Sequence, residues 1–309
     1  VWILTLIIGL FYAKVPKIVI RAVKFILRIT LLIPLVILII PIFNFADVIY
    51  SLIIGLLFLT VGYAIISKLI KNDLNTIAIL SGLTTIILLF DMAVFNQFLI
   101  KNSLLGYDPI IGARFYGIGN EYMGVLVGAS LITISIFFEK FGFKNIILLP
   151  FALAVVFIMG NPMMGANVGG TITISAAFLF LILKSNGIKI DIKKIIGIFG
   201  AIILIVSFMA WMDFNNENRS HLANTILTII NTGPSAILQI IIRKISMNIQ
   251  LISASMWSRV LILAIILMVM LFYKPFGVLK KLCQKHPYIA NGWIAILVVS
   301  VVGFMVNDS

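Results

Sequence analysis

The stretch "YMGVLVGASLITISIFF" (residues 122–138) contains no charged residue and follows Glu121 directly. An α-helix rises about 1.5 Å per residue, so a helix of this length spans roughly 25 Å. That distance is close to the thickness of a bilayer's hydrocarbon core. The charged pair Glu139 and Lys140 ends the run. This stretch therefore predicts a transmembrane helix.

Similar apolar runs recur along all 309 residues, of which 62% are hydrophobic and 11% charged. Soluble domains have roughly 45–50% apolar and about 25% charged residues, so these values indicate an integral membrane protein. We predict a single all-α membrane domain over residues 1–309, a polytopic bundle of about ten helices. The predicted membrane segments are 1–13, 27–43, 48–67, 76–95, 122–138, 146–160, 168–183, 195–212, 256–273 and 288–306. Because the first run begins at Val1 and basic residues follow it, we expect a truncated membrane helix and no signal peptide.

Basic residues concentrate in every second connection between these segments. The connections that carry them are 14–28, 68–71, 140–144, 184–194 and 274–285. Under the positive-inside rule we expect these connections to face the cytoplasm, with the chain as a multi-pass protein of the cytoplasmic membrane. This asymmetry accounts for the net charge of +13 without any nucleic-acid partner. The first basic stretch, 14–28, is predicted to be a topology anchor, with a basic amphipathic surface helix as the alternative.

The glycine-rich stretch "GARFYGIGN" (112–120) comes immediately before Glu121. Its glycines disfavour a continuous helix, so we predict a broken or re-entrant segment on the extracytoplasmic side. The free N–H groups of the following helix favour an anion. Arg114 and Asn120 are therefore candidate substrate-binding residues. Glu121 is a candidate general base, or else it caps the helix and pairs with Arg114.

A second stretch, "GANVGG" (165–170), matches "GARFYG" at three of six positions and also precedes an apolar run. Glycine-broken segments in corresponding positions often mark a binding site. The preceding "GNPMMGAN" (160–167) supplies Asn161 and Asn167, amides suited to sugar hydroxyls. The alternative is that these small residues only allow close helix packing.

A third polar stretch, "DFNNENRSHLANT" (213–225), contributes Arg219 for substrate binding and His221 as a second candidate base. The region 222–244 after it is apolar but broken at Asn231–Thr232–Gly233–Pro234. It is predicted to be a re-entrant hairpin or an outer-interface helix pair, which returns Arg243 and Lys244 to the same surface. Two histidines on opposite faces and one cysteine cannot supply a metal site. No cofactor motif is present.

The motifs "GARFYGIGNEYMGVL", "GANVGGT", "RSHLANT" and "RKISMN" resemble a family of bacterial polytopic membrane proteins that has no assigned function. A second pattern resembles the O-antigen ligase and polymerase group, in which an Arg, a Gly three residues later and a Gly–Asn pair precede a membrane helix on the periplasmic side. Here the matching residues are Arg114, Gly117 and Gly119–Asn120. The spacing here is one residue shorter, and Glu121 replaces a proline. In that group extracytoplasmic arginines hold the pyrophosphate of a polyprenyl-linked glycan. The resemblance implies that role for Arg114, Arg219 and Arg243.

Two function classes follow from these patterns. The first is an extracytoplasmic-facing enzyme that transfers or polymerises a lipid-linked envelope glycan or a phosphorylated lipid. The second is a transporter or flippase of an anionic envelope precursor, and a membrane anchor for a larger protein is a third possibility. In each case the expected partners are membrane lipid and, for the first two, a polyprenyl-phosphate-linked or other anionic substrate.

Overall fold

The structure is a computed structural model that describes residues 15–43, 47–106, 116–214, 227, 231, 233–273 and 277–307. These residues form helices and turns, with no β-strand among them. The first half contains α2 (Lys17–Ile39), the 3-10 helix η2 (Ile40–Phe43), α3 (Val48–Leu69), α4 (Asp73–Ala93), α5 (Phe98–Asn102) and α7 (Asn120–Phe141). The second half contains α8 (Asn145–Gly160), α9 (Val168–Ser185), α10 (Ile192–Phe214), α12 (Pro234–Ala254), α13 (Met256–Tyr273), α14 (Gly277–Lys285) and α15 (Pro287–Val306).

Seven helices within the described ranges are long and apolar enough to cross a membrane, and α12 with α13 would make eight if the bent pair is one span. The all-α multi-pass bundle is thereby confirmed. The number ten is not established, because α8 is a shorter apolar helix and segment 1–13 lies outside the described residues. The nine predicted segments from 27–43 onward each coincide with a helix. Their ends differ by a few residues, except that α2 begins at Lys17 and not at 27.

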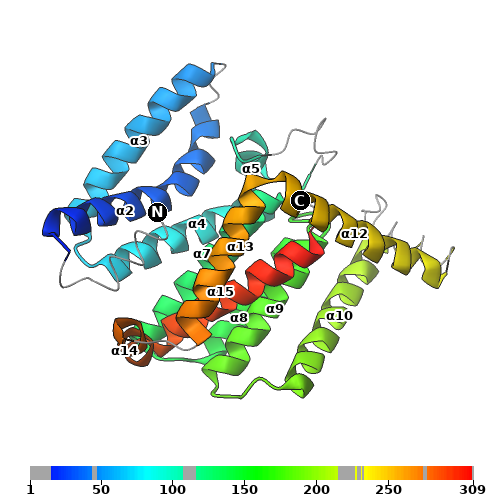
Figure 1. Ribbon diagram of the computed structural model, residues 1–309. Helices are drawn as coiled ribbons and strands as arrows, with labels where there is room; N and C mark the ends of the chain where they lie inside the picture. Colours follow the sequence, from blue (N-terminus) through cyan, green and yellow to red (C-terminus); the bar gives the residue numbers. More distant parts are fainter. Residues whose placement is uncertain are drawn as a thin grey trace.

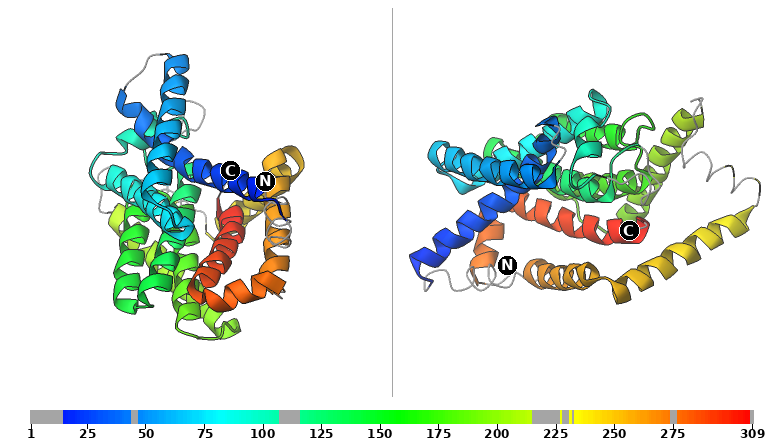
Figure 2. Two further views of the ribbon diagram at one scale, coloured as in Figure 1. Left: turned by 90° about the vertical axis from the view of Figure 1, so that its left-hand side faces the viewer. Right: turned by 90° about the horizontal axis from the view of Figure 1, so that it is seen from above.

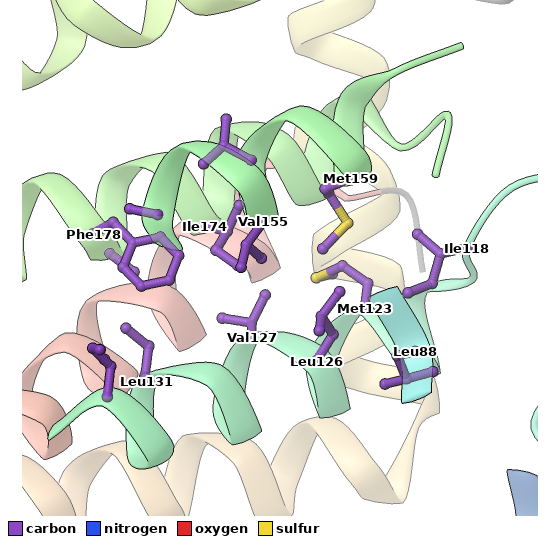
Figure 3. Close-up of a cluster of buried hydrophobic side chains, with 14 of the residues drawn as sticks. Leu88, Ile118, Met123, Leu126, Val127, Leu131, Val155, Met159, Ile174 and Phe178 are labelled. Atoms are coloured by element: carbon purple, nitrogen blue, oxygen red, sulfur yellow. The ribbon is translucent and has the colours of Figure 1, made fainter. Parts of the chain in front are cut away.

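The centre of the bundle is formed by α7, α9 and α15, with α4 packed on α7 and α8 on α9 (Figure 1). Figure 3 shows Val127 and Leu131 of α7 facing Ile174 and Phe178 of α9 in this core. On the outer helices many large apolar side chains stay exposed, such as Leu56 of α3 at 63%. Burial inside and apolar exposure outside are what a bundle surrounded by lipid requires.

Most polar contacts between helices lie at the two ends of the bundle, and the bond from Thr133 of α7 to Ser81 of α4 lies between the ends. At one end, which we call the basic end, contacts join the connections that carry most of the basic residues. These contacts are Lys24 and Arg28 with Asp73, Lys140 with Asn75, Glu139 with His286, and Asn145 with Asn186. At the other end, which we call the glycine end, α4 and α8 finish while α7 and α9 begin. Connections alternate between the two ends as the charge pattern predicted.

The basic segment 14–28 is partly contained in α2, which starts after Pro16 and includes Pro34. Arg28 donates to Asp73 at the start of α4 over 2.9 Å and to Ser67 near the end of α3 over 3.2 Å. The α2 ribbon bends along its length (Figure 1), as expected for a helix with an internal proline. These contacts fix the first three described long helices to one another at the basic end.

Candidate functional site

The two glycine-rich stretches lie against each other at the glycine end. The Ile118 N–H donates to the Gly165 carbonyl over 2.8 Å. The Asn167 side-chain amide donates to the Ile118 carbonyl over 3.0 Å. The peptide groups at Ile118 are thus bound on both sides by the segment that precedes α9. The two glycine-rich stretches, which resemble each other in sequence, are therefore in direct contact in the fold.

Glycine is required where these segments meet. Gly117 has a φ of +90°, and a Cβ there would lie 2.5 Å from the Gly165 carbonyl oxygen. A Cβ on Gly165 would collide with the Met159 carbonyl oxygen. Residues 116–119 are not helical, and α7 begins at Asn120. The glycines allow a close approach of two backbones that side chains would prevent.

Asn167, predicted to bind substrate, is only 2% exposed and has two structural contacts. Its Oδ1 accepts a hydrogen bond from the Gly170 N–H over 2.7 Å, which makes it the N-cap of α9. Its Nδ2 is the donor to Ile118. Asn161 is half-buried, and its Oδ1 accepts from the Met163 N–H over 2.9 Å within the same loop. Both amides hold loop backbone in place.

Gln97 also bonds to the two glycine-rich stretches, and the sequence patterns did not mark it as a site residue. It is 1% exposed, its Oε1 accepts from the Gly117 N–H over 2.9 Å, and its Nε2 donates to the Met164 carbonyl over 2.8 Å. It therefore joins the end of α4 to both glycine stretches. We call Gln97, Gly117, Ile118, Gly165 and Asn167 the hub.

Asp91, the last acid of α4, is also fully buried and was not predicted as a site residue. Its two carboxylate oxygens accept the Leu99 and Ile100 N–H groups, each over 2.9 Å. The carboxylate thus fixes α5 to the end of α4, beside the hub. The sequence did contain a signal, because Asp91 is the only acid within the predicted segment 76–95 and intramembrane acids are rarely placed without a function.

Glu121 lies in the first turn of α7, is exposed, and follows Asn120, which is half-buried. The N-cap of α7 is Gly119, so no side chain caps this helix. A carboxylate in a first turn is favourable because the helix dipole is positive there. Arg114, Arg219 and His221 lie outside the described residues, so their predicted roles next to Glu121 stay predictions.

Arg243 and Lys244 lie on α12, which meets α13 at 94° and extends away from the bundle (Figures 1 and 2). The Lys244 ammonium donates to the Val306 carbonyl over 2.7 Å, at the last turn of α15, where a positive charge complements the helix dipole. Asn307 follows that turn and packs against Gly169 of α9. This contact brings α12 to the glycine end, and Arg243 stays exposed there.

A separate polar contact lies at the basic end, around His286, which the sequence patterns did not mark as functional. Its Nδ1 lies 3.2 Å from Oε1 of Glu139 on α7. The other oxygen of Glu139 accepts the Tyr288 N–H over 3.0 Å and the Ile289 N–H over 3.4 Å. Glu139 therefore caps the N-terminus of α15 from a neighbouring helix, and this contact sets how α15 packs on α7.

Among the described residues, no three histidines, cysteines or acids come together in a way that could hold a metal ion. No family model matches the chain, and no curated protein or solved structure matches it either. The arrangement of residues at the glycine end is therefore the basis for a proposed function.

Proposed function

We propose that the protein is a membrane enzyme that transfers or polymerises a lipid-linked envelope glycan or a phosphorylated lipid on the extracytoplasmic side of the bacterial cytoplasmic membrane. The observation that supports this proposal most is the convergence at the glycine end. The described parts of three stretches that were chosen separately for their polar residues lie at the same end of the bundle: 116–121, 161–167 and 243–244. Direct hydrogen bonds join the first two to each other, and Lys244 donates to the last turn of α15.

The hub supplies a rigid base for such a site. The side chains of Gln97 and Asn167 are satisfied by backbone groups, so they hold the start of α7 in one position. The first turn of α7 has no side-chain cap and contains Glu121 at an exposed position. An anionic head group next to these N–H groups would be favoured by the helix dipole, with Arg114 on the adjacent segment as its main partner.

In this proposal α12 lies along the outer membrane surface. Large apolar side chains recur every three or four residues along one of its faces and are exposed: Leu238, Ile241, Ile242, Ile245, Ile249 and Ile252. A helix of this pattern inserts its apolar face into the interface of a bilayer. Arg243 would then face head groups at the level of the hub, next to the Lys244 ammonium that donates to the Val306 carbonyl.

The proposed reaction needs no ATP, because a diphosphate-linked lipid carries its own leaving group. An acceptor hydroxyl attacks the anomeric carbon of the donor sugar, the bond from that carbon to the diphosphate oxygen breaks, and polyprenyl diphosphate leaves. Glu121 or His221 takes the proton of the acceptor hydroxyl. Arg114, Arg219 and Arg243 with Lys244 neutralise the charge on the leaving diphosphate.

The test is ligand-dependent thermal stabilisation of the purified protein in nanodiscs. Polyprenyl diphosphate should raise the melting temperature, whereas the uncharged polyprenol of equal length should not. Arg114→Lys should abolish the increase because lysine cannot make the bidentate contact, and Arg21→Lys on exposed α2 is the matched control. Equal stabilisation by the two lipids would refute the proposed head-group recognition.

A glycan-transfer assay distinguishes the enzyme proposal from the transporter alternative. Glu121→Gln should keep the stabilisation by polyprenyl diphosphate and lose glycan transfer, if Glu121 is the base. If the reconstituted protein moves a labelled lipid-linked precursor between leaflets and leaves it chemically unchanged, the transporter alternative is correct and the enzyme proposal is wrong.

A further inference from the structure

The short helix α14 (Gly277–Lys285) lies between α13 and α15 at the basic end. It runs crosswise to both helices: Figure 1 views it nearly along its axis, and the left view of Figure 2 shows it across the ends of α13 and α15. Tyr288 and Trp293 follow it in the first two turns of α15, and both residue types are enriched at membrane–water interfaces. A helix at a large angle to a spanning helix, next to such residues, lies along the membrane surface.

The sequence of α14, "GVLKKLCQK", has the pattern of an amphipathic helix. Apolar residues occupy positions 278, 279, 282 and 283, and polar residues occupy positions 280, 281, 284 and 285. With about 3.6 residues per turn, the two sets fall on opposite faces of the helix. Leu282 is 49% exposed, so the protein covers its side chain only in part. An apolar face opposite a basic face is the pattern of helices that lie in the interface of a bilayer.

The three lysines of α14 have no acidic partner within the protein as described. Lys280, Lys281 and Lys285 are all exposed, and none of them forms an ion pair with another described residue. Three positive charges therefore lie close together on one helix, on the face away from its apolar residues. Their mutual repulsion favours a negatively charged partner from outside the chain.

The acids at the basic end already have other partners. In the described part of the chain these acids are Asp73, Glu139 and Asp191. Asp73 is bound by two cations of α2, and Glu139 accepts N–H groups at the start of α15. Asp191 accepts the N–H of Lys194 over 2.9 Å. The negative charge that complements α14 therefore has to come from its surroundings, and the nearest surroundings of a surface helix are lipid head groups.

We propose that α14 binds the anionic phospholipids of the membrane leaflet at the basic end. Its apolar face enters the interface, and its lysine ammonium groups contact lipid phosphates. A basic residue near an anionic surface strengthens binding about fivefold, so three lysines together contribute on the order of a hundredfold. If the lysines only set membrane topology, they face water whichever lipids are present. The inference does not depend on the function proposed for the glycine end, which lies at the opposite end of the bundle.

The single native cysteine, Cys283 on α14, allows a direct test by fluorescence. A dye on this residue is quenched by brominated phosphatidylcholine when α14 lies in the bilayer, and by the neutral aqueous quencher acrylamide when it does not. In nanodiscs that contain phosphatidylglycerol, acrylamide quenching should be roughly threefold weaker or less than in nanodiscs of phosphatidylcholine alone. An increase from about 0.1 M to about 1 M salt should reduce this difference, because the Debye length falls from about 10 Å to about 3 Å.

Substitution of the lysines assigns the effect to α14. The variant Lys280→Gln/Lys281→Gln/Lys285→Gln should quench equally in both kinds of nanodisc, and glutamine keeps the helix because its helix propensity is close to that of lysine. The matched control is a triple glutamine variant that removes the same charge from exposed positions between α9 and α10, at the same end of the bundle, and it should behave like wild type. Its positions are Lys184, Lys189 and Lys193. Equal quenching of the wild-type chain in both nanodiscs, or loss of the difference in the control as well, would overturn the proposal.

Discussion

Replacement of Asn167 is the most direct test of the hub. In Asn167→Ala, α9 loses its N-cap, which typically costs about 1 kcal/mol. The Ile118 carbonyl also loses its amide donor in a site where Asn167 is 2% exposed, and an unsatisfied buried group costs about 1–3 kcal/mol. The sum is a loss of about 2–4 kcal/mol in the free energy of unfolding.

Asn167→Ser separates the two contributions. Serine is as good an N-cap as asparagine, but its side chain is too short to reach Ile118, so only the second cost of about 1–3 kcal/mol should remain. The measurement is reversible unfolding in mixed detergent and SDS micelles, supported by melting temperatures. Asn161→Ala is the control, because Asn161 is half-buried and its side chain accepts a hydrogen bond from Met163 within its own loop, and it should cost less than about 1 kcal/mol. If Asn167→Ala costs no more than Asn161→Ala, the hub does not hold the two stretches together.

Other substitutions test the remaining features of the fold. Gly117→Ala should destabilise the protein by about 2 kcal/mol or more and lower its yield in the membrane, because φ is +90° and the new Cβ would lie against a carbonyl oxygen; wild-type thermal stability would contradict this. Glu139→Ala should cost about 1–3 kcal/mol in the same unfolding assay, since it leaves N–H groups at the start of α15 without an acceptor; an unchanged unfolding midpoint would contradict the cap. In a chain without the native cysteine, Met163→Cys should react with a membrane-impermeant thiol reagent in intact cells and Lys189→Cys should not. The reverse labelling would place the glycine end in the cytoplasm.

Hydropathy predicted the helices well, because the lipid environment requires every span to be about twenty residues long and almost free of charge. The predicted segment 122–138 became α7 over Asn120–Phe141, and 168–183 became α9 over Val168–Ser185. The length of a span and the absence of charge are local properties of the sequence, so a window of about twenty residues contains the information.

The region around α12 was harder to predict. The predicted segment 222–244 was divided at Asn231–Pro234 and ended at Lys244, whereas α12 begins at Pro234 and continues to Ala254. Proline at the first position of a helix marks its start, which agrees with the predicted break. The polar residues between 245 and 254 concealed the continuation, because an amphipathic helix has too little overall hydrophobicity to stand out as a membrane segment.

The hub could be predicted only in part. The likeness of "GARFYG" to "GANVGG" pointed to two special backbone segments, but nothing local indicated that they touch each other. Gln97 joins them across 20 residues to Gly117 and 67 residues to Met164, and its amide looks like any polar residue in a turn. Long-range hydrogen bonds of this kind depend on how helices pack, which a single sequence does not contain.

Hydrogen bonding divides the polar residues at the glycine end into two groups with different expected effects on substitution. Asp91, Gln97 and Asn167 are buried, and backbone groups already satisfy them, so their replacement should lower stability before it alters any chemistry. Glu121 and Arg243 are exposed at the same end of the bundle. Exposure is a requirement for any group that contacts a ligand. A substitution at Glu121 or Arg243 that abolishes function in a fully stable protein would therefore place the chemistry on the surface of the hub. Loss of function that always accompanies loss of stability would mean that the glycine end has a structural role alone.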